Sequence, residues 1–379
     1  MATAPPSPDS PPRRILLIRP SALGDVARTV PCLATLAAHW PDAQIDWLVD
    51  ARYVDAVRGH PRLHQVVPFD RKNKASLRPL LGQLKSADYD VVVDLQGLAR
   101  SGLFSWATRA PLRIGYANAR ELGWLGYNRR HAVPSDRHSA DRMLALLEAE
   151  GLTRVEDFRL HVPDDCHGFT ESLLSSPPGP TSGSPTGETA GSGDVFCLAP
   201  TAQWGCKCWP IENFAELAAG LLRDAPTSTL IVLAAPGELD SVQTAFAGAL
   251  PQELLRRVHF PRTSVGQMMD VIAHARLLVG NDSAPLHLAV GLDTPSVSIF
   301  GPTDPALVGP PPRIAGKTTH DRHRVIRAAS AIGRTFNYRR HRDDNRLIAE
   351  TPVSRVADEV RDLLSHAPPP LLPPADAAI

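Results

Sequence analysis

The sequence predicts an α/β protein made of two Rossmann-like domains with parallel sheets and a cleft between them. Its 379 residues correspond to about two domains at roughly 150 residues each. Short apolar segments alternate with helical patterns, as expected for parallel sheets that helices cover on both faces. A stretch rich in Pro, Gly, Ser and Thr at residues 175–194 divides these elements into two blocks.

The first block, at residues 14–174, opens on the apolar segment RILLI and continues through a polar turn into a helical pattern. Its expected strands are 14–18, 44–49, 65–69 and 90–94, and its expected helices are 26–39 and 77–85.

The second block, at residues 195–352, repeats this order of strand, polar turn and helix. Its expected strands are 195–199, 229–234, 257–260, 277–280 and 296–300, and its expected helices are 211–223, 239–249 and 264–274. A last helical pattern at 353–366 could pack on either domain.

The 37 prolines gather largely outside these blocks. We expect a disordered arm at 1–13, a disordered linker or insert at 175–194 and a disordered tail at 367–379, because such tracts bury too little apolar surface to offset their chain entropy.

The charge balance argues against a protein that binds nucleic acid. Lys plus Arg and Asp plus Glu are both 40, so no excess positive charge is available to hold a polyanion. The five cysteines are odd in number and widely spread, which favours reduced thiols in a cytoplasm. No secretory signal and no membrane-spanning segment is expected.

The first polar turn places Ser21, Gly24 and Asp25 at the carboxyl end of a strand, where ligands bind in such sheets. Asp25 could accept a proton from an attacking hydroxyl, and Gly24 would allow close backbone approach. Ser21 or Asp25 could instead simply cap the following helix, and the residues alone favour this alternative.

The turn at 200–210 gathers Thr201, Gln203 and Lys207 before a helix, a combination that suits a phosphate or diphosphate. A solvated lysine in a polar loop is a comparable interpretation. Cys206 and Cys208 are spaced too closely for a usual zinc pair and have no second pair, so no metal site is expected.

Glu238 follows the strand at 229–234 and could accept the hydroxyls of a ribose, or could favour the positive end of the next helix. No dinucleotide fingerprint and no Walker loop accompany it, so a nicotinamide enzyme is disfavoured.

The segment GNDSAPLHLA at 280–289 again joins a strand, a polar turn and a helix. Asp282 lies at the turn, and the amides of Ser283, Ala284 and Leu286 could face an anion. His287 would reach the same ligand from the first helical turn, although a lone helical histidine is more often a structural hydrogen-bond partner.

Taken together, these stretches resemble the heptosyltransferases of lipopolysaccharide core synthesis in glycosyltransferase family 9. The matching segments are RILLIRPSALGDVARTVPCL, DVVVDLQGLARSGLF, ARELGWLGYNRRH, KCWP and GNDSAPLHLAVGLDTPSVSIFGPTDP. The ARELGWLGYNRRH stretch is most similar to the heptosyltransferase I branch, which adds the first heptose to Kdo on lipid A. The loop DSAPLH departs from the family's Asp-Thr-Gly-x-x-His pattern, and residues 309–345 follow no family pattern.

The resemblance implies a GT-B fold, an ADP-heptose donor, a Kdo-lipid A-type acceptor, inversion at the anomeric carbon, and neither metal nor cofactor. It implies that Asp25 is the general base, that Lys207 binds the donor phosphate, that Glu238 binds the ribose, and that Asp282 and His287 bind the donor. It also implies a cytoplasmic protein in peripheral contact with the inner membrane.

On the acceptor side, the resemblance adds Arg120 and Arg129, and a basic cluster gives Arg71. That cluster, completed by Arg58, Arg62, Lys72 and Lys74, could face Kdo carboxylates or lipid phosphates, or could be an ordinary solvated surface. The alternatives are heptosyltransferase II, another family 9 transferase with a different donor or acceptor, or a non-catalytic protein that binds sugar nucleotides or glycans.

Overall fold

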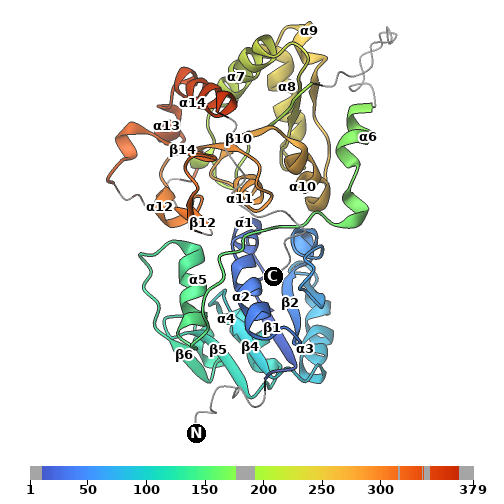
Figure 1. Cartoon of the computed structure of the whole chain (residues 1–379), viewed down its shortest axis with the longest axis vertical. Coiled ribbons are helices and arrows are strands. Elements are labelled where there is room, and N and C mark those ends of the chain that lie inside the picture. Colours follow the sequence, from blue (N-terminus) through green and yellow to red (C-terminus); the bar gives the residue numbers. More distant parts are fainter. Residues whose placement is uncertain (1–10, 176–192, 315, 335, 337–341, 367–379) are drawn as a thin grey trace. The chain divides into compact units, whose positions relative to one another are not determined.

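The structure, a computed structural model, describes residues 11–175, 193–314, 316–334, 336 and 342–366. The chain divides after Pro163 into two compact units (Figure 1). Most of the arm expected at 1–13, most of the insert expected at 175–194 and the whole tail at 367–379 lie outside the described residues. None of the helices in the described part of the chain combines the length and the apolar character that crossing a membrane requires.

The first unit is a parallel six-stranded sheet in the order β3-β2-β1-β4-β5-β6. Its strands are β1 (Arg14–Ile18), β2 (Gln44–Asp50), β3 (Gln65–Phe69), β4 (Val91–Asp94), β5 (Leu112–Tyr116) and β6 (Arg129–His131). Its helices are α1 (Leu23–Ala27), α2 (Val30–His39), α3 (Leu77–Ser86), α4 (Ala99–Ala107) and α5 (Ser139–Glu148), with 3-10 turns η1 (Ala51–Ala56), η2 (Lys74–Ser76) and η3 (Gly123–Gly126). This strand order is that of a Rossmann domain.

The second unit repeats the same order of strands, β9-β8-β7-β10-β11-β14, again all parallel. Its strands are β7 (Val195–Ala199), β8 (Thr229–Val232), β9 (Val258–His259), β10 (Leu277–Asn281), β11 (Ser296–Phe300) and β14 (His323–Arg327), besides the small antiparallel pair β12 (Arg313–Ile314) and β13 (Lys317–Thr318). Its helices are α6 (Phe169–Ser175), α7 (Ile211–Asp224), α8 (Leu239–Ala249), α9 (Gln252–Leu255), α10 (Val265–His274), α11 (Ala284–Gly291), α12 (Pro305–Val308), α13 (Arg346–Ala349) and α14 (Val353–Ser365), with 3-10 turns η4 (Asp164–Cys166), η5 (Gly205–Lys207) and η6 (Ala329–Ala331).

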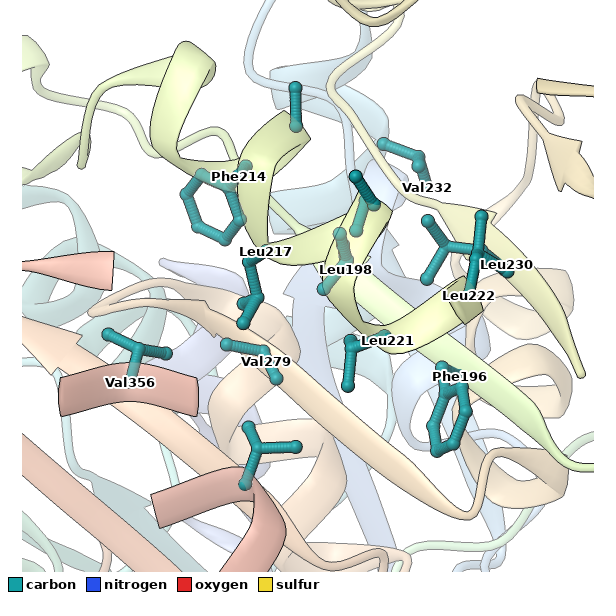
Figure 2. Packing of buried hydrophobic residues seen from close by; sticks show 14 of the residues in the cluster. Phe196, Leu198, Phe214, Leu217, Leu221, Leu222, Leu230, Val232, Val279 and Val356 are labelled. Carbon is teal, nitrogen blue, oxygen red and sulfur yellow. The ribbon is translucent and has the colours of Figure 1, made fainter. Parts of the chain in front are cut away.

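The core of the second unit forms where α7 lies against the sheet. Phe214, Leu217 and Leu221 of α7 face Leu198 of β7 and Val279 of β10 (Figure 2). Full burial of one such side chain stabilises the fold by about 1.5–3 kcal/mol. The helix α14 packs beside α7 and closes this core, so the last helical pattern of the chain belongs to the second unit.

The helix expected at 26–39 is wrong as one continuous element, because two helices occupy this stretch. The helix α1 ends at Ala27 and α2 begins at Val30, with Pro31 in its first turn. Proline has no amide hydrogen and its ring collides with the carbonyl four residues earlier, so a helix can start at Pro31 but cannot run through it.

The boundary between the units also differs from the one expected at residue 174, because α6 belongs to the second unit. The Thr170 amide and hydroxyl donate to Oδ2 of Asp270 on α10 at 2.8 and 2.6 Å. Asp270 is fully buried, so these hydrogen bonds and the packing of α6 on α10 fasten the segment to the second core.

Candidate active site

Asp25 lies on α1, directly after the carboxyl end of β1, and both of its carboxylate oxygens face arginines. Arg19 contacts Oδ2 at 2.9 Å and Arg28 contacts Oδ1 at 2.5 Å. The Asp25 side chain is 29% exposed, whereas those of Arg19 and Arg28 are 13% and 10% exposed. The ionised carboxylate, the form that accepts a proton, is thus held in place yet reachable. The Ala22 amide also donates to it at 3.4 Å, so Asp25 has part of the capping role as well.

The turn after β4 lies beside this carboxylate. The Ser21 amide donates to the Gln96 side chain at 3.3 Å, and Arg19 donates to the Leu95 carbonyl. Gly24 is buried in the first turn of α1. Because β1 and β4 flank the point where the strand order reverses, these residues line the crevice in which ligands of such sheets bind.

A buried carboxyl fixes the turn after β4, which borders this crevice. Asp94, at the end of β4, accepts from the Tyr127 hydroxyl at 2.6 Å and from the Gln96 amide at 2.8 Å. Complete burial raises the pKa of Asp94, although these hydrogen bonds act in the opposite direction. Asp94 therefore shapes the turn that borders Asp25.

The three acceptor-side arginines occupy different places in the first unit. The Arg120 amide donates to the Gly97 carbonyl at 2.9 Å, which brings Arg120 to the turn after β4. Arg71 is exposed two residues beyond β3, and Arg129 lies inside edge strand β6 rather than in a turn. The Arg120 hydrogen bond therefore places this residue next to the crevice around Asp25.

Two members of the expected basic cluster have structural partners. Arg58 pairs with Asp55 at 2.7 Å. Arg62 donates to the carbonyl of Ala37, in the last turn of α2, at 3.2 Å and to that of Pro41, just after the helix, at 3.1 Å. These contacts engage two of the cations, but all five residues of the cluster are exposed.

In the second unit, Lys207 and Asp282 meet although they are far apart in the sequence. The Lys207 ammonium donates to Oδ2 of Asp282 at 2.6 Å, and the Thr303 hydroxyl donates to the same oxygen at 2.6 Å. The pair joins the turns after β7 and β10, which again flank the reversal of strand order.

The helix α11 begins beside this pair. The Ser283 hydroxyl is buried and has no hydrogen-bond partner among the described residues, and Ser283 precedes the first helical residue, Ala284. The first amides of a helix have no acceptor within the helix, so this end of α11 attracts an anion. His287 is 6% exposed on the same helix.

The expectation for Leu286 is wrong. Its amide donates to the Ser283 carbonyl at 3.2 Å, and its side chain is fully buried. The tight first turn of α11 thus uses this amide internally, which leaves the amides of Ser283 and Ala284 for a ligand.

Thr201, Gln203 and Glu238 lie in the turns after β7 and β8. The Ala235 amide donates to the Thr201 hydroxyl at 3.3 Å, which ties the two turns together. Glu238 is exposed and close to Cys208: burial raises the pKa of that thiol, and the charge of Glu238 adds to the increase. Gln203 is exposed in the same turn as Lys207.

Several residues that support this site were not among the sequence candidates. Asn281, fully buried, accepts from the Trp209 amide at 3.0 Å and donates to the Pro200 carbonyl at 2.7 Å, which fastens the loop that carries Lys207. Thr303 lies in the quoted segment GPTDP, where nothing singles it out before the fold is known.

The segment at 342–345 also reaches this loop. The Arg342 carbonyl accepts from the Cys206 amide at 2.6 Å, and its guanidinium stacks on Trp204, 4.5 Å from the ring centre. Part of the region for which the sequence suggested no role therefore packs against the Lys207 turn.

No group of three or more His, Cys, Asp or Glu side chains is arranged to hold a metal ion within the described ranges.

The chain is similar to known proteins over most of its length. The family model "Glycosyltransferase family 9 (heptosyltransferase)" matches residues 77–320. Lipopolysaccharide heptosyltransferase 1 of Pseudomonas aeruginosa is 30% identical over 313 residues, covering 78% of this chain and 81% of that protein. Lipopolysaccharide heptosyltransferase 1 of Escherichia coli K12 is 27% identical over 310 residues, covering 78% and 90%.

Among solved structures, E. coli ADP-heptose lipopolysaccharide heptosyltransferase II superposes with a TM-score of 0.74 at 21% identity. The match covers 93% of this chain and 99% of that one. This likeness concerns the fold: the two Rossmann-like units are those of a GT-B protein, which confirms the predicted fold class, while the cleft between the units stays a prediction.

Proposed function

The chain belongs to glycosyltransferase family 9, and from this premise we propose that it transfers heptose from ADP-heptose to Kdo on a lipid A-type acceptor. Family membership makes it a glycosyltransferase. The donor, the acceptor and the roles of single residues are our proposal. We also propose that the protein acts at the cytoplasmic face of the inner membrane.

The observation that carries the donor assignment is the unpartnered Ser283 hydroxyl at the start of α11, beside the Lys207–Asp282 pair. A buried hydroxyl without a partner costs stability, unless a ligand supplies the missing oxygen or hydrogen. A diphosphate fits this place, since the ammonium and the helix amides offer it positive charge. The α11 turn thus has the chemistry to bind the donor diphosphate.

The nucleoside half of the donor would lie toward the turn after β8. Glu238, exposed there, can accept the hydroxyls of a ribose, and Thr201 fastens this turn to the one that carries Lys207. The adenine preference is inferred from the family resemblance. Thermal shifts with ADP, UDP and GDP test it: the largest increase in melting temperature should come with ADP, and a preference for UDP would overturn it.

Asp25 serves as the base in this proposal. It removes the proton of the acceptor hydroxyl while that oxygen attacks the anomeric carbon from the face opposite the diphosphate. The bond from that carbon to the diphosphate breaks, so ADP leaves with the bonding electrons and the configuration inverts. The charge that develops on ADP is stabilised by the Lys207 ammonium and the α11 amides.

The acceptor is tested by product formation. Purified protein receives ADP-heptose with either a Kdo-bearing lipid A or the same lipid that already carries one heptose, and mass spectrometry measures the products. We expect addition only to the first acceptor. Addition only to the second would make the chain a heptosyltransferase II, and addition to neither would refute the proposed reaction.

A further inference from the structure

Four large apolar side chains that are open to solvent belong to one part of the first unit. Leu103 and Trp106 lie on α4, and Leu122 and Leu125 lie at η3, with exposed fractions of 38, 60, 63 and 59%. A single exposed apolar residue needs no explanation, but a group of them indicates a surface that meets another apolar phase. We call these four residues the α4–η3 apolar face.

Glycines bring the two segments of this face into direct contact. A Cβ on Gly126 would lie 2.1 Å from the Gly102 carbonyl oxygen, and one on Gly102 would lie 2.3 Å from the Gly123 carbonyl oxygen. Such approaches need backbones that touch without side chains between them. The leucines that adjoin these glycines in the sequence are therefore carried by backbone segments in contact, and Trp106 follows Leu103 on the same side of α4.

Arginines surround the apolar face. Residues 98–130 contain six arginines and one acidic residue, Glu121, in a chain whose formal net charge is zero. Arg100 and Arg109 are exposed at either end of the α4 part, and Arg120 is exposed next to the η3 part. Arg130, also exposed, stacks on Trp124 at 4.7 Å from its ring centre. Exposed cations around an apolar centre match the surface of an anionic bilayer.

This face adjoins the edge of the sheet that carries Asp25. The Arg120 amide donates to the Gly97 carbonyl in the turn after β4, and Gln96 of the same turn accepts from the Ser21 amide. A lipid-borne acceptor held by this face would therefore present its sugar at the edge where the proposed base lies.

We propose that the α4–η3 apolar face docks the first unit onto a bilayer of anionic lipids, with its arginines on lipid phosphates. This inference rests on the proposed function in one respect: a lipid-borne acceptor is the reason that docking on a bilayer would be useful. Trp106 lies at the level of the headgroups and the three leucines enter the acyl boundary.

The test is flotation of the full chain with vesicles of phosphatidylglycerol and phosphatidylethanolamine, and with vesicles of phosphatidylcholine alone. The variant changes Leu103→Gln, Trp106→Gln, Leu122→Asn and Leu125→Ser. Asparagine is chosen at 122 because Leu122 has a φ of 63°, a left-handed conformation that asparagine tolerates. Ile332→Ser is the matched control, since Ile332 is 64% exposed but lies in the second unit.

We expect wild type and the Ile332 control to float with the anionic vesicles only, and the fourfold variant to bind at least about tenfold more weakly. Replacing Arg100 and Arg109 with Gln should reduce the salt-sensitive part of vesicle binding. Arg223 is an exposed arginine of α7 in the second unit, and Arg223→Gln should leave this part unchanged.

Equal vesicle binding by wild type and the fourfold variant would overturn the proposal, as would a wild type that does not bind. Loss of a dimer in the variant, seen by analytical ultracentrifugation without any change in flotation, would assign the face to a second copy instead. A water-soluble Kdo acceptor without acyl chains separates the two proposals. The fourfold variant should retain turnover on this soluble acceptor. A wild type that is inactive on every acceptor would refute the proposed function but would leave the flotation result unchanged.

Discussion

The Lys207 ammonium and Oδ2 of Asp282 lie 2.6 Å apart and join the turns after β7 and β10. Their side chains are 14% and 4% exposed, so little water solvates the lysine, and the Asp282 carboxylate balances its charge instead. An ammonium has three hydrogens to donate, so the contact with Asp282 does not by itself exclude a second acceptor such as the proposed diphosphate.

Lys207→Met should weaken the binding of ADP by about 10- to 100-fold, because a hydrogen bond to a charged group contributes roughly 1.5–3 kcal/mol. Isothermal titration calorimetry measures the affinity. Lys85→Met, a change at an exposed lysine in the last turn of α3, is the control and should bind ADP like wild type. Unchanged affinity in Lys207→Met would refute the donor assignment.

Ser283→Ala and Thr303→Val should separate ligand binding from stability. The Ser283 hydroxyl has no partner in the described part of the protein, so its removal should leave the melting temperature of the ligand-free protein unchanged or raise it, and should weaken ADP binding by roughly two- to tenfold. Thr303→Val removes a hydrogen bond to the Asp282 carboxylate and should lower the free energy of unfolding by about 1.5–3 kcal/mol. A melting temperature that falls in Ser283→Ala would mean that the hydroxyl has a structural role.

Asp25→Asn should lower the rate of heptose transfer by about 100-fold or more, because the amide cannot accept the proton. Asp141→Asn is a matched control: Asp141 also lies in the first turn of a helix and pairs with an arginine, Arg154, at 2.9 Å. Rates are compared at saturating donor, and circular dichroism checks the fold. A fall of less than about tenfold with the fold intact would contradict the role of Asp25 as base.

The stability of the first unit should fall as the pH drops below neutral, partly because of His60. Burial lowers the pKa of His60 to about 4, and the neighbouring His161, 5.0 Å away, acts in the same direction. Between the ordinary value of 6.5 and about 4, the unfolded chain binds a proton that the folded protein does not, so acid favours unfolding.

His60→Asn tests this dependence, since its amide oxygen can replace Nδ1 as acceptor for the Arg62 amide. Urea melts at pH 7 and pH 5 should show a loss for wild type that exceeds the loss for the variant by on the order of 2 kcal/mol. His366→Asn, at an exposed histidine, should behave like wild type. An equal loss in wild type and His60→Asn would show that His60 does not cause it.

Gly126→Ala should destabilise the protein by about 1–3 kcal/mol, because its Cβ would collide with the backbone of Gly102. Gly82→Ala, on α3, meets nothing within 4 Å and should stabilise by roughly 0.5–1 kcal/mol. Denaturant melts of both variants measure the difference. An unchanged free energy of unfolding in Gly126→Ala would mean that α4 and η3 can move apart without loss of stability.

The elements that the sequence predicted are those with continuous apolar runs. The expected strands at 14–18, 65–69, 195–199 and 296–300 coincide with β1, β3, β7 and β11. The missed strands include the edge strands β6 (RRH) and β14 (HRVIR) and also β5 (LRIGY), which lies between β4 and β6 inside its sheet. RRH and HRVIR contain few apolar residues, and Gly115 interrupts the short apolar run of β5, so none of these segments gives a strong strand pattern.

The candidate site was predicted as separate turns, each at the end of a strand. The structure brings Lys207 and Asp282 together, a contact that depends on strand order and so cannot be read from either turn alone. The Thr303 hydroxyl was missed for the same reason, because it follows the neighbouring strand β11. Arg19 and Arg28 lie in the same segment as Asp25, and they were missed because the geometry of the turn decides which way their side chains point.

The repeated strand order has a consequence for how substrate preference can change. Each unit carries its own sheet and its own buried core, and each has its candidate residues at its own reversal of strand order. In the proposed function the second unit binds the donor and the first the acceptor, so chimaeras that exchange whole units between relatives would pair one sugar donor with a different acceptor.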